Sequence, residues 1–144
     1  MPIYMKYEGI EGTATGKHKG WIELESCQLG ISHNMSNPMG AGANRENSRI
    51  LSSGEIVITK ISDTINSTQL FRESLQGEGK KVVIDFVKND ETVYLSIELE
   101  NTIISSYSIS GNSSGEARPM ETISLNFTKI IYKAIPAARN LMLE

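Results

Sequence analysis

Val93-Tyr94-Leu95-Ser96-Ile97-Glu98-Leu99-Glu100 is an unbroken alternation of aliphatic side chains with Tyr, Ser and Glu. A period of two predicts a β-strand, with the aliphatic side chains on one face and the other side chains on the opposite face. Because only one face is apolar, we expect this strand to lie in an antiparallel sheet with one packed side and one wet side.

Segments on either side of residues 93–100 repeat this pattern. A strand is predicted over residues 81–87, and the turn Asn89-Asp90-Glu91 joins it to residues 93–100 as a hairpin. Further strands are predicted for residues 3–7, from Trp21 through Ile31, and for residues 56–61, 102–109 and 122–132, with a bulge or bend at Ser26 and Cys27, where the apolar parity switches. We therefore expect a mainly β fold, a bent β-barrel or sandwich of about six to eight strands.

One segment has the pattern of a helix. Asn66 is a candidate N-cap, Phe71 and Leu75 lie four residues apart, and Gly77 is a typical C-terminal stop. This spacing predicts a single short α-helix over about residues 67–76. Its apolar stripe should pack against the β-structure.

Residues 32–53 contain Pro38, Gly40, Gly42 and many Asn and Ser residues, with few apolar side chains. We predict a long loop here. Loops of this length are uncommon inside compact domains and usually have a function or are ordered by a partner.

The whole-chain composition restricts the class of protein. A length of 144 residues predicts one domain spanning residues 1–144. A net charge of −3 without a basic cluster argues against nucleic acid as a partner, and no apolar run approaches the ~20 residues that membrane insertion requires. The N-terminal residues lack the features of a signal peptide, so we expect folding in the cytoplasm and, if the protein is exported, another route out of the cell.

Sites for metals, cofactors and nucleophilic catalysis find little support. His18 and His33 have no Cys or His at ligand spacing, and no phosphate-binding or dinucleotide motif is complete. Cys27 is the only cysteine and is predicted to be a small buried side chain rather than a nucleophile. We expect no metal, no cofactor and no enzymatic activity.

Read in order, these segments resemble the haemolysin-coregulated protein (Hcp) family of the bacterial type VI secretion machine. The resemblance covers about residues 2–133 and is carried by residues 3–12 (IYMKYEGIEG), 18–24 (HKGWIEL), 57–63 (VITKISD), 103–107 (IISSY) and 121–130 (ETISLNFTKI), together with the lone helix. Family members often have a longer C-terminal segment than this chain, which puts any role of that segment in doubt.

The resemblance implies a bent β-barrel with one helix that assembles into six-membered rings around a wide pore. It implies that the rings stack into a tube inside a contractile sheath and below a spike protein, and that the tube is expelled with effector proteins in its pore. The expected partners are therefore the chain itself, the spike, the sheath and effectors. The expected localisation is the bacterial cytoplasm and then the exterior.

Within this picture, two groups of residues are candidates for function. Ser26 and Gln28, just past the predicted bend, are predicted to face the pore, where small polar side chains leave room for effectors. The loop residues Met35, Met39, Arg45 and Arg49 are predicted to contact the next ring.

Two other functions are open at this point. A monomeric β-sandwich that binds a ligand such as carbohydrate would need exposed aromatic residues, and aromatic residues make up only 6% of the chain. A small hydrolase could use the carboxylate pairs Glu23 with Glu25 or Glu98 with Glu100, but the same spacing arises on any solvated strand face.

Overall fold

The computed structural model describes residues 1–36, 49–115, 117–135 and 140–143, with side chains described outside residues 33–53 and 136–144. The elements follow in the order β1 (Ile3–Tyr7), the 3-10 helix η1 (Gly16–His18), β2 (Ile22–Leu24), β3 (Ser26–Ser36), β4 (Arg49–Ile61), α1 (Ser67–Gln76), β5 (Lys80–Val87), β6 (Val93–Ser110), β7 (Met120–Asn126), β8 (Lys129–Ala134) and β9 (Asn140–Leu143).

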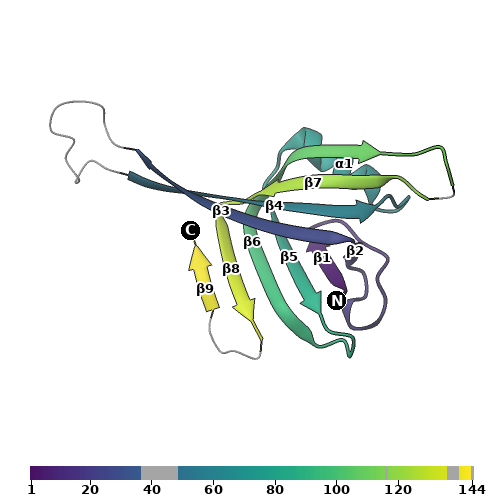
Figure 1. The fold of residues 1–144 in the computed structure, drawn as a ribbon, viewed down its shortest axis with the longest axis horizontal. Coiled ribbons are helices and arrows are strands. Elements are labelled where there is room, and N and C mark those ends of the chain that lie inside the picture. The colour runs from purple at the N-terminus through teal and green to yellow at the C-terminus, as the bar shows by residue number, and fades with distance from the viewer. Residues whose placement is uncertain (37–48, 116, 136–139, 144) are drawn as a thin grey trace.

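The strands form one bent antiparallel sheet with two halves (Figure 1). The first part of β6 pairs with β5 and β8, and its last part pairs with β7, so this one long strand belongs to both halves. One half has the order β2-β1-β5-β6-β8-β9 and the other has the order β6-β7-β4-β3. We call the second half the β3 half.

The mainly β fold with one helix and a bent sheet is confirmed. The described residues contain nine strands instead of the six to eight expected, because β8 and the short β9 add to the first half. The sheet is not closed into a barrel by hydrogen-bonded pairing: β2 pairs with β1, and β3 pairs with β4. The chain itself links these two strands, since Glu25 is the single residue between them.

The apolar faces of the two halves pack against each other as one core. The core residues include Met5, Ile22, Ile56, Ile58, Leu70, Ile84, Ile97, Leu99, Ile123 and Leu125, each at most 2% exposed. Full burial of one such side chain stabilises the fold by about 1.5–3 kcal/mol. The alternation in residues 93–100 has the predicted result, since Ile97 and Leu99 are buried on this face.

The predicted bend near Ser26 is confirmed, and two strand boundaries are corrected. In a regular strand, side chains three positions apart point to opposite faces. Leu24 and Cys27 nevertheless both face the core, because the chain turns at Glu25. Residues 93–110, predicted as two strands, are one strand that bends at Asn101, where φ is +52°. Residues 122–132, predicted as one strand, are split between β7 and β8.

The prediction of a long loop over residues 32–53 is wrong at both ends. β3 extends to Ser36, β4 begins at Arg49, and the two strands pair in continuous register out to Ser36 and Arg49. Their hairpin projects past the other strands (Figure 1). The projecting part of the hairpin does not pack against the core, so it needs few apolar residues. Its two strands are held together by the hydrogen bonds between their backbones.

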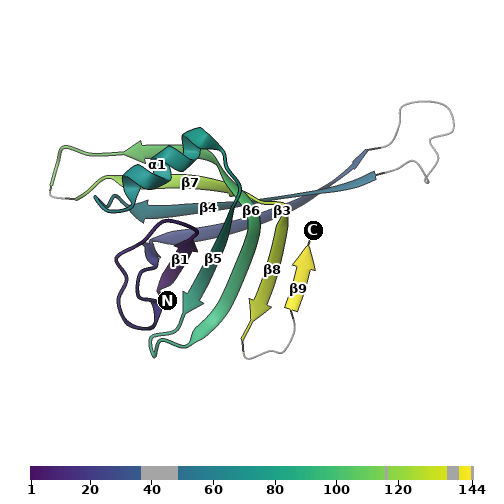
Figure 2. The ribbon, with the colours of Figure 1, turned by 180° about the vertical axis from the view of Figure 1, so that it is seen from behind.

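Helix α1 has the predicted bounds, but it is anchored differently. Gly77 ends it in the left-handed conformation (φ +65°), as predicted. Asn66 makes no side-chain cap hydrogen bond; instead the Ser67 hydroxyl accepts a hydrogen bond from the Asp63 amide at 2.8 Å. Leu70 is the buried apolar residue, whereas the predicted stripe of Phe71 and Leu75 is exposed. Figure 2 shows α1 on the β3 half, where it packs against β6.

A buried ion pair joins α1 to the sheet. Lys60 of β4 and Glu121 of β7 are directly opposite each other, with Nζ and Oε1 2.6 Å apart and both side chains at most 2% exposed. The same carboxylate accepts hydrogen bonds from the Ser67 hydroxyl at 2.7 Å and from the Tyr107 phenol. Three strands and the helix therefore meet at one buried carboxylate.

Replacing Lys60 with Met should lower the free energy of unfolding by about 3–5 kcal/mol, because the Glu121 charge would stay buried without its cation. The matched control is Lys133→Met, which breaks the partly exposed pair of Lys133 and Glu98 (2.9 Å) and should cost about 1 kcal/mol or less. Urea denaturation followed by circular dichroism measures both. Equal losses in the two variants would contradict the role given to the buried pair.

Candidate functional site

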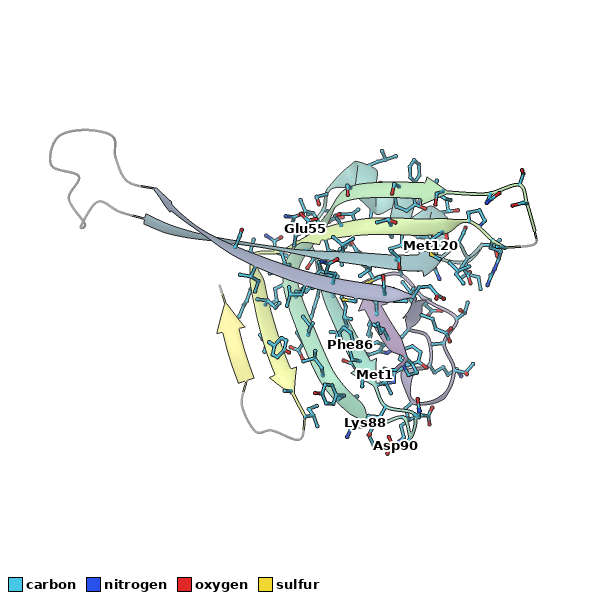
Figure 3. All side chains as sticks on the ribbon, viewed as in Figure 1. Met1, Glu55, Phe86, Lys88, Asp90 and Met120 are labelled. Atoms are coloured by element: carbon cyan, nitrogen blue, oxygen red, sulfur yellow. The ribbon has the colours of Figure 1, made fainter. Side chains whose placement is uncertain are left out.

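The solvent side of the β3 half carries three rows of cross-strand neighbours, which we call the polar face. Strand register defines the rows as Ser26-Thr59-Thr122-Ser108 (row 1), Gln28-Val57-Ser124-Ser106 (row 2) and Gly30-Glu55-Asn126-Ile103 (row 3). None of these residues is buried. Figure 3 labels Glu55 where the long hairpin leaves the body and Met120 near the opposite end of this half.

The polar face results from the same alternation that builds the core. In β7, for example, Ile123 and Leu125 are fully buried, while the alternating residues Thr122, Ser124 and Asn126 are only partly buried. The sequence thus places small polar side chains on one side of the sheet and aliphatic ones on the other.

The polar face is rich in hydroxyl groups and nearly uncharged. Seven of its side chains are Ser, Thr or Gln, and Glu55 is its single ionisable residue. In row 1 the hydroxyl groups of Ser26 and Thr59 are hydrogen-bonded at 2.5 Å. Hydroxyl groups both donate and accept hydrogen bonds, so a face of this kind can meet many protein surfaces without a fixed geometry.

The structure puts the predicted pore residues Ser26 and Gln28 together on the polar face, both exposed. Of the predicted stacking residues, Met35 and Arg49 lie at the outer end of the hairpin, where only their backbone is described. Met39 and Arg45 lie outside the described residues.

Sequence reasoning missed most of the polar face. Thr59, Thr122 and Ser124 face the same side as Ser26 only because three strands pair in one register. The available signal was the alternation of Thr, Ser and Asn with aliphatic residues in residues 122–126.

Row 3 contains a hollow of about 350 Å³, lined by Gly30, Ile31, Ser32, Gly54, Glu55 and Asn126. Gly30 contributes no side chain, and the position that a Cβ would take there is open space. Gly54 is constrained on the other side of the strand, because a Cβ there would lie 2.5 Å from Cζ of Phe127. The hollow is thus open because Gly30 has no side chain beside the Glu55 carboxylate.

Some of the side chains considered for catalysis or metal binding contact neighbouring strands. Glu98 pairs with Lys133, and the imidazole of His18 donates a hydrogen bond from Nε2 to the buried Asp85 at 2.8 Å while stacking on Tyr4. Burial raises the pKa of the Cys27 thiol to about 11. Across the described part of the chain, no three His, Cys, Asp or Glu side chains are close enough to hold a metal ion.

A second hollow of about 630 Å³ lies on the other half of the sheet. It is formed where the connection between β1 and β2 folds back, and Trp21, Lys6, Lys19, Lys81, Glu8 and Glu11 are among its lining residues. The charges around this hollow are of both signs, and Trp21 contacts His18 edge-on instead of entering the core.

Comparison with known proteins gives a consistent result. The family described as "Type VI secretion system effector, Hcp" matches residues 4–133. No curated protein sequence matches the chain. Among solved structures, Hcp1 from Salmonella typhimurium is 24% identical, with a TM-score of 0.76 over 98% of this chain and 91% of that one. A type VI secretion system effector from Yersinia pestis is 22% identical, with a TM-score of 0.67 over 98% and 96% of the two chains.

The TM-scores establish that the fold is shared with the solved structures, and the family match covers residues 4–133 of the 144. Helices able to span a membrane are not found among the residues that the structure describes.

The Cys27 thiol should react slowly in the folded protein. A pKa of about 11 instead of 9 means roughly a hundredfold less thiolate at pH 8, and the thiolate is the reactive form. The rate of reaction with a chromogenic disulfide reagent at pH 8 should therefore rise steeply when the protein is unfolded in urea, and in the folded protein it should increase with pH up to about 11. Equal rates in the folded and unfolded protein would contradict this prediction.

The two glycines of the hollow should differ in their response to alanine. Gly54→Ala should cost about 1–3 kcal/mol of unfolding free energy, because the new methyl group collides with the Phe127 ring. Gly30→Ala adds the same methyl group to open space and should change stability by about 0.5 kcal/mol or less. Urea denaturation of the pair measures the difference, and a reversed order would contradict the described packing of Phe127.

Proposed function

We propose that this chain, which belongs to the Hcp family of the type VI secretion system, is a structural subunit of that system's inner tube. Copies join side by side into hexameric rings, and the rings stack into a tube that is expelled. The pore of the ring carries effector proteins. The chain itself performs no catalytic step.

The observation that carries this proposal is the polar face together with its open borders. Within the β3 half, β3 pairs only with β4, and the end of β6 pairs only with β7 among the described strands. Exposed strand edges are unpaired hydrogen-bonding groups that natural proteins usually cover. Lateral association of copies would cover these edges and place the polar faces next to one another in a continuous wall.

Such a wall suits a pore better than a buried interface. Most of its side chains carry hydroxyl or amide groups, with one carboxylate per copy, and such groups are stable in contact with water and do not need a permanent partner. Ser26 and Gln28 would then line the pore, as the sequence predicts, together with Thr59, Thr122 and Ser124.

The projecting hairpin suits contact between rings. Its strands extend beyond the rest of the sheet (Figure 1), so in a ring it would reach toward the next layer. Met35, Met39, Arg45 and Arg49 are the residues we assign to this contact. Spike, sheath and effectors are the further partners, and the chain would be made in the bacterial cytoplasm and leave the cell with the tube.

The purified chain should form hexamers of about 95 kDa, six times the subunit mass of 15.9 kDa. Native mass spectrometry measures the mass, and negative-stain electron microscopy should show rings with a central hole. A monomer at every protein and salt concentration would overturn the proposal and would leave the monomeric binding module as the better reading.

A further inference from the structure

We propose that the row 3 hollow of the polar face binds one cationic side chain, an arginine or a lysine, of a protein carried in the pore. This inference rests on the proposed function, because it names the chemistry by which the same face would recognise its passenger. It concerns the position where Gly30, Glu55 and Asn126 lie side by side on neighbouring strands.

Charge is the first argument. Glu55 is the single ionisable residue of the polar face and is exposed. Among the described residues, no ion pair and no side-chain hydrogen bond involves its carboxylate, whereas Glu98 and Glu121 both have lysine partners. On an otherwise neutral surface, a single carboxylate selectively attracts a cationic side chain of a partner protein.

Space is the second argument. A side chain at position 30 would stand directly beside Glu55, but Gly30 leaves this place open, with nothing within 4 Å of an added Cβ. The resulting hollow of about 350 Å³ is larger than one side chain needs, so a long flexible side chain can enter it with its end group at the carboxylate.

Hydrogen-bonding chemistry is the third argument. Asn126 lies directly opposite Glu55, and its Oδ1 atom is buried without a hydrogen-bond donor in the described part of the protein. The row therefore contains two oxygen acceptors without a partner among the described residues, the exposed carboxylate of Glu55 and the covered amide oxygen of Asn126 beside it. A guanidinium group, with its fork of N–H donors, fits a carboxylate with a neighbouring amide better than a neutral side chain does.

A bound metal ion fits the hollow less well. Divalent cations such as Ca²⁺ take six or more oxygen ligands, usually with several carboxylates. Glu55 is the only carboxylate among the residues that line this hollow. An arginine or lysine side chain carries its own hydrogen-bond donors, so the single negative charge of Glu55 is sufficient to pair with it.

The test is a titration of the full chain, labelled with ¹⁵N and ²H, followed by TROSY NMR. The probe is Nα-acetyl-arginine N-methylamide, and the control probe is the citrulline analogue, which has the same shape without the charge. With the arginine probe, the amide signals of Gly30, Gly54 and Glu55 should shift and saturate. The citrulline probe should bind at least about tenfold more weakly, as expected for loss of a charged hydrogen bond.

Glu55→Gln should abolish these shifts, because it keeps the shape of the side chain and removes its charge. The matched control is Glu23→Gln, which removes another exposed carboxylate, from β2 in the other half of the sheet, and should leave the arginine affinity within about twofold. Equal binding of the two probes, or shifts that persist in Glu55→Gln, would overturn the inference, as would shifts spread over all exposed carboxylates.

The outcome of this titration can be distinguished from the outcome for the proposed tube function. Native mass spectrometry of the same variants reports ring formation independently of the probe. Rings that persist in Glu55→Gln while the arginine shifts disappear support the inference. A wild-type chain that forms no rings overturns the proposed tube, while rings without arginine binding overturn only the cationic hollow.

Discussion

The ion pair between Lys60 and Glu121 is the interaction on which the rest of the β3 half depends. Both charges are on the core side of the sheet, directly opposite each other on β4 and β7, and hidden from water. A buried charge without its partner is strongly unfavourable, so this pairing disfavours any other register of the two strands. The hydrogen bonds from Ser67 and Tyr107 extend the same constraint to α1 and β6.

Register in turn determines the polar face. A slip of one residue between β4 and β7 would turn Ile58 or Ile123 toward water and Thr59 or Thr122 toward the core. The hydroxyl-rich rows therefore exist because an ionic contact on the hidden side fixes which residues stand opposite one another. In this way a core interaction defines the composition of the surface that we assign to the pore.

The sequence predicted what depends on local periodicity and missed what depends on pairing. The strand at residues 93–100, the helix at residues 67–76 and the bend near Ser26 were predicted because each follows from neighbouring residues. The long β3–β4 hairpin was missed because its outer part faces no core and so has no apolar alternation. The sequence singled out Ser26 and Gln28 but not Glu55 and Asn126, since only the register brings Glu55 and Asn126 beside Gly30.

A conduit must hold its cargo and still release it, and the composition of the polar face suits both tasks. A typical hydrogen bond to a neutral hydroxyl contributes only about 0.5–1.5 kcal/mol, so each such contact on this face is weak and replaceable. One carboxylate in each copy adds a stronger but salt-sensitive contact. Repeated around a ring, weak contacts of this kind combine into substantial retention, because a cargo held at one position stays near the others. In the proposed tube, loss of the ring would remove that advantage, so disassembly would favour release of the cargo.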